Sequence, residues 1–182
     1  MMGESIKYFD PFSTVLSYPG QDYHLRIEEC RRALAEKHPE VAERLRLFEA
    51  AAAEQTTPQR EELYIQTFDL NKLCTLDLGW HLFGEDYNRG LFLVKLRKEM
   101  QRLGIPESAE LPDHLTHVLA ILGRMDHAAA ADFATSCVIP AVKKLGEGLK
   151  AKKGNPYTAV VEGLLELLEA ECAQPLEEAY HG

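Results

Sequence analysis

LTHVLAIL, residues 115–122, places leucine at 115, 119 and 122 and valine at 118, which is the i, i+3, i+4, i+7 spacing of one helix face. The same helical spacing recurs in four other groups: Val41, Leu45, Phe48 and Ala52; Leu93, Leu96, Met100 and Leu103; Val138, Val142, Leu145 and Leu149; and Val161, Leu164, Leu165 and Leu168. No useful length of sequence alternates in the way of a half-buried strand. The sequence therefore predicts an all-α fold, a helical bundle.

Helix breakers and capping residues divide the chain into roughly eight or nine helices. The breakers stand at Tyr18-Pro19-Gly20, His38-Pro39, Thr57-Pro58, Gly104-Ile105-Pro106, Pro112-Asp113 and Gly154-Asn155-Pro156. We expect Thr57 to cap one helix, with Pro58 in its first turn, and Pro112 and Asp113 to open another. Pro140 lies either in a first turn or at a kink.

The chain has no internal repeat and no linker rich in glycine, serine and proline. We expect a single domain over residues 1–172, with residues 106–113 as its most hinge-like segment. The polar tail over residues 173–182 is expected to fray.

Composition narrows the class of protein. A hydrophobic content of 46% is too high for a disordered chain, and no apolar run approaches the ~20 residues that span a bilayer. Residues 1–10 lack the pattern of a signal peptide, so we expect a cytoplasmic protein. The formal net charge of −9 disfavours nucleic acid and anionic lipid as partners and favours a basic peptide.

The sequence offers little for catalysis or cofactor binding. Its four cysteines are scattered without a Cys-x-x-Cys pair, and we interpret them as free thiols, mostly in the core. No nucleotide-binding loop or nucleophile elbow is present. His114 and His117 lie three residues apart on an expected helix, so a helical metal-dependent hydrolase that also uses His81 stays as an alternative. The other interpretation of this pair makes Asp113 a helix-start residue and leaves His117 exposed.

Three blocks occur in order along helical sequence: YIQTFD at 64–69, HLFGEDYNRG at 81–90 and ELPDHL at 110–115. Together they resemble the NarJ family, the chaperones that assemble molybdenum cofactor into respiratory nitrate reductase, and the wider group of TorD-type redox-enzyme maturation proteins. The resemblance implies a TorD-like helical fold and a cytoplasmic chaperone without enzymatic activity, cofactor or metal. A permanent helical subunit of a redox complex is a further alternative.

The resemblance also implies the partner. It would be the N-terminal segment of the apo catalytic subunit of a nitrate reductase, with cofactor-delivery proteins as further partners. The chaperone itself would be a monomer or a weak homodimer. In TorD-type chaperones the Pro-Asp-His block lies beside the groove that binds the client, so we expect Asp113 and His114 to be exposed and to act in binding rather than in folding.

The candidate client-binding residues are Tyr64, Asp69, Trp80, His81, Arg89, Asp113 and His114. The ring of Tyr64 suits a groove wall, whereas Phe68 suits the core. Asp69 lies near a helix C-terminus, where the helix dipole disfavours a negative charge, so a cationic peptide or a tertiary contact is needed to explain it. The remaining residues have structural interpretations as well. For Trp80 the core is favoured, Arg89 suits a structural ion pair, and Gly90 would let a neighbouring helix approach closely.

Overall fold

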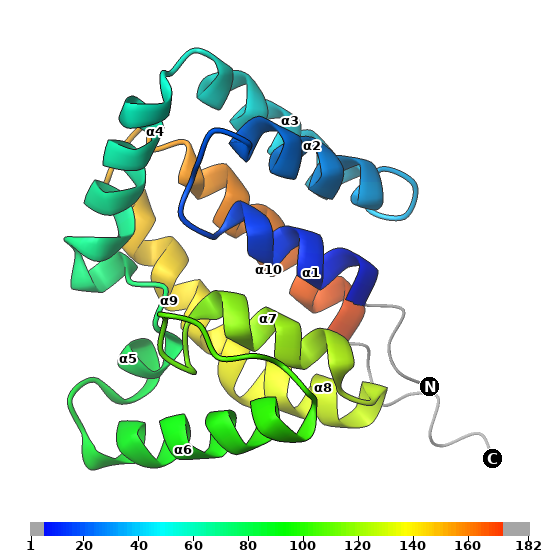
Figure 1. Cartoon of the computed structure of the whole chain (residues 1–182), viewed down its shortest axis with the longest axis vertical. Helices are drawn as coiled ribbons and strands as arrows, with labels where there is room; N and C mark the ends of the chain where they lie inside the picture. Colours follow the sequence, from blue (N-terminus) through cyan, green and yellow to red (C-terminus); the bar gives the residue numbers. More distant parts are fainter. Residues whose placement is uncertain (1–5, 173–182) are drawn as a thin grey trace.

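The computed structural model describes residues 6–172, and the regular elements of this part of the chain are all helices (Figure 1). Its α-helices are α1 (Ile6–Val15), α2 (Tyr23–Leu34), α3 (Pro39–Ala53), α4 (Thr57–Tyr64), α5 (Leu78–Phe83), α6 (Tyr87–Arg102), α7 (Leu115–Arg124), α8 (His127–Phe133), α9 (Ile139–Lys150) and α10 (Tyr157–Cys172). Two π-helical turns, η1 (Ile65–Asp69) and η3 (Ala134–Val138), and a 3₁₀ turn, η2 (Lys72–Cys74), complete the described helical segments.

The all-α prediction is confirmed, and no strand occurs within residues 6–172. Turn η3 joins α8 and α9 into one continuous helix, so the ten α-helices of this part of the chain form nine separate ones, as predicted. Pro140 lies in the first turn of α9, directly after η3. The expected fraying of residues 173–182 concerns a segment outside the described residues.

Most helix boundaries follow the breakers, with two corrections. The cap of α4 is Thr56 rather than Thr57: Thr56 Oγ1 accepts a hydrogen bond from Gln59 N at 3.3 Å, and the Gln59 side chain accepts one from Thr56 N at 2.9 Å. Pro112 and Asp113 do not open a helix, because α7 begins at Leu115 with His114 as its cap.

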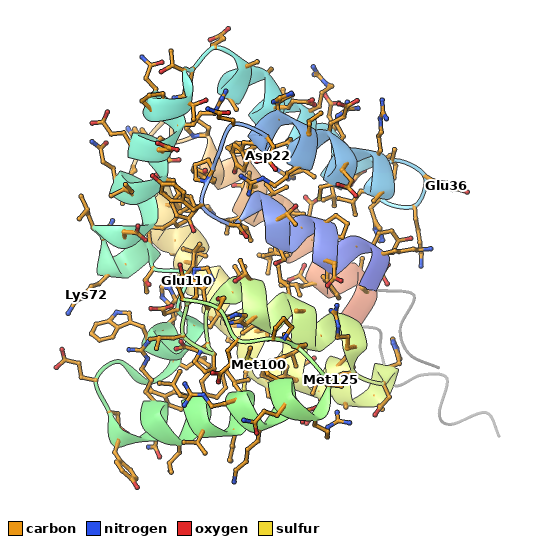
Figure 2. The ribbon with its side chains drawn as sticks, viewed as in Figure 1. Asp22, Glu36, Lys72, Met100, Glu110 and Met125 are labelled. Atoms are coloured by element: carbon orange, nitrogen blue, oxygen red, sulfur yellow. The ribbon has the colours of Figure 1, made fainter. Side chains whose placement is uncertain are left out.

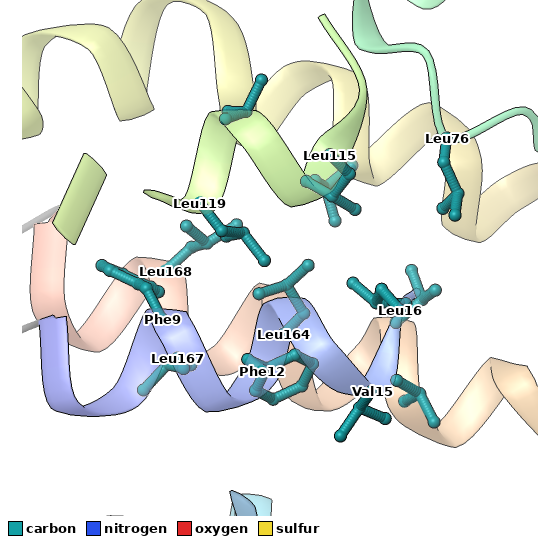
Figure 3. Packing of buried hydrophobic residues seen from close by; sticks show 14 of the residues in the cluster. Phe9, Phe12, Val15, Leu16, Leu76, Leu115, Leu119, Leu164, Leu167 and Leu168 are labelled. Carbon is teal, nitrogen blue, oxygen red and sulfur yellow. The ribbon is translucent and has the colours of Figure 1, made fainter. Parts of the chain in front are cut away.

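One part of the core lies between α1, α7 and α10 (Figure 3). Phe9 and Phe12 of α1, Leu119 of α7 and Leu164 and Leu168 of α10 are fully buried there. Removal of such side chains from water is the main favourable contribution to folding. The helical periodicity in the sequence therefore identified the core face of α7 correctly, and that of α10 except for Leu165, which is partly exposed.

The cysteines are free thiols, as expected. Cys30, Cys74 and Cys172 are buried, and Cys137 is half-buried. Burial raises the pKa of the Cys172 thiol to about 12, which keeps it protonated and unreactive at neutral pH.

Candidate functional site

The third sequence block pairs through its backbone with the segment that precedes the second block. Asp77 and His114 form an isolated antiparallel bridge. On one side of it Leu78 N donates to Asp113 O at 2.9 Å, and on the other Leu115 N donates to Leu76 O at 2.8 Å. The start of α7 is thus held against the segment that leads into α5, although 36 residues of chain lie between the bridged pair in sequence (77 to 114).

Asp113 is the buried centre of this junction. Its side chain is fully buried, and Oδ2 accepts hydrogen bonds from Gly79 N at 3.0 Å and from Nε and Nη2 of Arg89, each at 3.2 Å. Arg89 Nη2 also lies 3.7 Å from Asp77 Oδ2. The structural ion pair predicted for Arg89 is confirmed. The expected exposure of Asp113 is wrong, because its carboxylate turns inward to the first turn of α5 and to Arg89.

Gly79 explains why this arrangement is possible. A β-carbon at Gly79 would lie 2.5 Å from Asp113 Oδ2, closer than non-bonded atoms approach. Gly90, by contrast, is exposed and has open space where a β-carbon would be. The close helix approach predicted at Gly90 is therefore wrong, and the glycine that permits close packing in this region is Gly79.

His114 is buried as well, contrary to the expectation of an exposed binding residue. Its Nδ1 lies 2.7 Å from Thr116 Oγ1 and accepts a long hydrogen bond from Thr116 N at 3.4 Å, which caps α7. Burial, with a smaller contribution from His117, lowers the pKa of His114 to about 4. The imidazole is therefore neutral at pH 7.

The three histidines that the hydrolase alternative would use each have their own hydrogen-bond partners. His117 is buried rather than exposed, with Nδ1 2.8 Å from Leu111 O and Nε2 3.0 Å from Ser108 Oγ. His81 Nε2 lies 2.7 Å from Thr75 O. No group of three His, Cys, Asp or Glu side chains within residues 6–172 is placed to hold a metal ion. The two contacts of His117 also anchor the 106–113 segment, our expected hinge, to α7.

Tyr64 is a core residue and not a groove wall. It is 3% exposed, and its hydroxyl donates to Leu16 O at 3.0 Å. Its ring packs edge-on against Phe68, with the centroids 5.1 Å apart. Phe68 is buried as predicted. The first sequence block therefore contributes its aromatic side chains to the core, and turn η1 directs Asp69 outward to solvent.

Acidic side chains gather where the three blocks converge. We call Asp69, Asp77 and Glu110 the acidic surface; Asp69 and Glu110 are exposed and Asp77 is partly exposed. Burial and the nearby Glu110 raise the pKa of Asp69. Burial, followed by the charge of Asp113, raises the pKa of Asp77 to about 6 against the opposing effect of Arg89. Negative charge is therefore incompletely neutralised here, which favours a cationic partner.

Exposed apolar side chains lie on the same segments. Leu70, directly after η1, is 75% exposed, and Leu73, within η2, is 67% exposed. Leu111 follows Glu110 and is 43% exposed. Trp80 is half-buried, with Lys72 Nζ 4.6 Å from its ring centre. In Figure 2, Lys72 and Glu110 mark the two segments that border this region. Sequence reasoning missed the three leucines, because Leu70 and Leu111 lie in irregular segments and Leu73 lies in the short 3₁₀ turn η2, where no periodicity marks them.

A family model described as nitrate reductase delta subunit matches residues 31–152, about two thirds of the chain. The chain belongs to the nitrate reductase delta subunit family. A protein of Bacillus subtilis (strain 168), named probable nitrate reductase molybdenum cofactor assembly chaperone NarJ, is 26% identical over 163 residues, which is 88% of each chain. The resemblance inferred from the three blocks is confirmed.

The part matched by the delta subunit family model runs from the last turn of α2 to just beyond α9 and contains the whole junction around Asp113. The acidic surface and its leucines thus belong to the family region of this chain. No helix in the described part of this family member is long and apolar enough to cross a membrane.

Proposed function

We propose that this member of the nitrate reductase delta subunit family is a cytoplasmic assembly chaperone without enzymatic activity. Its client is the apo catalytic subunit of a molybdenum nitrate reductase, and it assists insertion of the molybdenum cofactor before the enzyme is complete. The observation that carries the proposal is the family match over residues 31–152, supported by similarity along 88% of the chain to a protein named as such a chaperone.

The geometry supports the acidic surface as the place where the client's N-terminal segment binds. Asp69 and Glu110 offer exposed carboxylates to a basic peptide, and Leu70, Leu73 and Leu111 offer apolar contact beside them. Charged groups steer a partner into contact, and apolar burial then holds it.

The other candidate residues contribute in two ways, Trp80 by direct contact and the buried residues by positioning. Trp80 borders the surface and contacts the peptide through the exposed part of its ring. Arg89, Asp113 and His114 position the 106–113 segment from the buried side, and His81 fixes the segment before α5 through Thr75. The geometry does not favour the hydrolase alternative, because His114, His117 and His81 each form separate local hydrogen bonds.

Deletion of the gene tests the function directly. We expect the catalytic subunit to be present but inactive and short of molybdenum, measured by metal analysis of the purified enzyme. Restoring the wild-type chain restores both properties. A deletion strain with normal molybdenum content and activity would contradict the proposal. Mature, cofactor-loaded enzyme that retains this chain through purification would favour a permanent subunit instead.

Charge reversal tests the binding surface. Asp69→Lys and Glu110→Lys should each weaken binding of a basic N-terminal peptide of the catalytic subunit by several-fold in calorimetry, with the largest effect at low salt. Glu36→Lys is the matched control, because Glu36 is exposed on the distant α2–α3 turn (Figure 2). If Glu36→Lys weakens binding as much as Glu110→Lys, the effect is one of net charge and the surface is misassigned.

A further inference from the structure

A cation of the chain itself lies on the ring of Trp80, the only tryptophan in the sequence. Lys72 Nζ is 4.6 Å from the centre of this ring, and Trp80 is half-buried in α5. A cation at this distance is attracted by the electron-rich face of the indole. The exposed face of Trp80 is therefore a cation-binding position, and in the chain alone an ammonium group fills it.

The ammonium group of Lys72 is held weakly. It also lies 3.9 Å from Glu85 Oε1, and the side chains of Lys72 and Glu85 are 75% and 82% exposed. An exposed ion pair and an exposed cation–π contact each change an equilibrium by only about two- to fivefold. A second cation can therefore replace Lys72 on the ring, and Glu85 stays as a partner for the displaced ammonium group.

The backbones of η2 and α5, by contrast, are both fixed on α9. Turn η2 packs so closely on this helix that a β-carbon at Gly148 would overlap Leu73 O. Helix α5 is tied to α9 as well, because Lys144 Nζ donates a hydrogen bond to His81 O at 2.9 Å. The side chain of Lys72 can thus leave the ring while both backbones stay in place.

This cation-binding position adjoins the proposed client surface. Lys72 lies between the exposed Leu70 and Leu73, three residues after Asp69, and Figure 2 shows it at the border of this region. Its positive charge offsets part of the negative charge that attracts a basic peptide. A peptide that covers these leucines therefore meets Lys72 on the ring of Trp80.

We infer, on the basis of the proposed function, that Lys72 competes with the client for the face of Trp80 and that an arginine of the client's N-terminal segment displaces it. A guanidinium group is planar and more weakly hydrated than an ammonium group, so it stacks better on an aromatic face. An arginine therefore gains more from the ring than Lys72 loses, whereas a lysine of the client exchanges one ammonium group for another. Lys72 thus makes the surface selective for arginine.

Calorimetry with an arginine-containing N-terminal peptide of the catalytic subunit tests the competition. Lys72→Met keeps a long, unbranched side chain without the charge. It should tighten binding by about three- to sixfold, because the ring face is then open in every molecule. Lys98→Met is the matched control, since it removes the same charge from an exposed lysine of α6, and it should change the affinity by less than about twofold. In a Trp80→Leu background, Lys72→Met should have no more effect than this control.

The peptide and the fluorescence of Trp80 give two further readouts. Replacing the arginines of the peptide by lysines keeps its charge. This change should weaken binding to the wild-type chain by about threefold or more, and should have little effect on binding to Trp80→Leu. Because Trp80 is the only tryptophan, its emission should change when a peptide without tryptophan binds. Circular dichroism confirms that each variant is folded.

The competition and the proposed function fail in different ways. Equal affinities of the wild-type chain and Lys72→Met, equal effects of Lys72→Met and Lys98→Met, or equal binding of the arginine and lysine peptides would overturn the competition while the client surface stands. A peptide that binds neither the wild-type chain nor Lys72→Met would overturn the client surface and the competition together.

Discussion

Replacement of Asp113 by alanine separates a folding role from a binding role. The carboxylate is fully buried and accepts three hydrogen bonds, one from Gly79 N and two from Arg89. Alanine leaves the buried Gly79 N–H without an acceptor, which costs about 1–3 kcal/mol. Arg89 is 21% exposed and still has Asp77 at 3.7 Å in the variant. Loss of the ion pair between Arg89 and Asp113 therefore lowers the free energy of unfolding by only about 1 kcal/mol more.

The unpartnered Asp113 Oδ1 reduces this cost slightly, because alanine no longer buries it without a hydrogen bond. We therefore expect Asp113→Ala to lower the free energy of unfolding by about 2–4 kcal/mol. If Asp113 acted only through the helix dipole, its replacement by alanine would lower the free energy of unfolding by about 1 kcal/mol or less. Asp113→Asn keeps an acceptor for Gly79 N and should cost less than alanine.

Urea denaturation followed by far-ultraviolet circular dichroism at pH 7.5 measures the difference, provided that the denaturant slope is unchanged. Asp69→Ala is the control, because Asp69 is an exposed aspartate of the same sequence motifs and should change stability by no more than about 0.5 kcal/mol. A loss below 1 kcal/mol for Asp113→Ala, or an equal loss for Asp69→Ala, would refute the assignment of Asp113 as the buried centre of the junction.

Three further predictions follow from buried contacts. Gly148→Ala should destabilise the fold by about 2 kcal/mol or more in urea melts, because the added β-carbon would overlap Leu73 O. Gly146→Ala is the control: its β-carbon would lie 3.9 Å from Val161 Cγ1, and the change should stabilise α9 by up to about 1 kcal/mol. The pKa of Asp77 is raised to about 6 in the folded protein, so the folded state favours the protonated carboxyl group. The stability that this proton contributes is fully present below the unfolded pKa and is lost as pH rises through 6. Asp77→Asn should therefore be more stable than wild type above pH 6 by about 1–2 kcal/mol, with the difference vanishing toward pH 4. His114 has a pKa lowered to about 4, so its contribution is present above pH 6.5 and lost as pH falls toward 4. His114→Asn, which keeps a capping side chain, should lose less stability than wild type over that range in pH-dependent melts.

The sequence predicted the fold well because its signals are local. Apolar spacing along Leu115, Val118, Leu119 and Leu122 marks a buried helix face whatever the rest of the chain does, and all four side chains are buried. The π-helical turns η1 and η3 were not predicted, because they leave little trace in the apolar pattern. A π-turn contains one residue more than an α-helical turn, which changes the backbone hydrogen bonds but hardly disturbs the spacing of the apolar residues.

The junction could not be predicted because it depends on contacts distant in sequence. A Pro-Asp-His-Leu stretch has the residue types of a helix start, and local propensity alone places Asp113 at that start. The structure instead pairs its backbone with Leu78 and its side chain with Arg89, 24 residues earlier. Likewise, nothing local distinguishes Gly79, which touches Asp113, from Gly90, which touches nothing.

The buried and exposed residues of the three blocks therefore have different tasks. Arg89 and Asp113 hold the 106–113 segment against α5, and this places the exposed Glu110 within electrostatic reach of Asp69, which the π-turn η1 directs to solvent. A change at Arg89 or Asp113 can weaken client binding only by loosening that arrangement, and it must then lower stability as well. On the proposed function, we expect a change at Asp69 or Glu110 to weaken binding while stability stays the same. Measured together, affinity and unfolding free energy distinguish the residues that position the surface from those that touch the client.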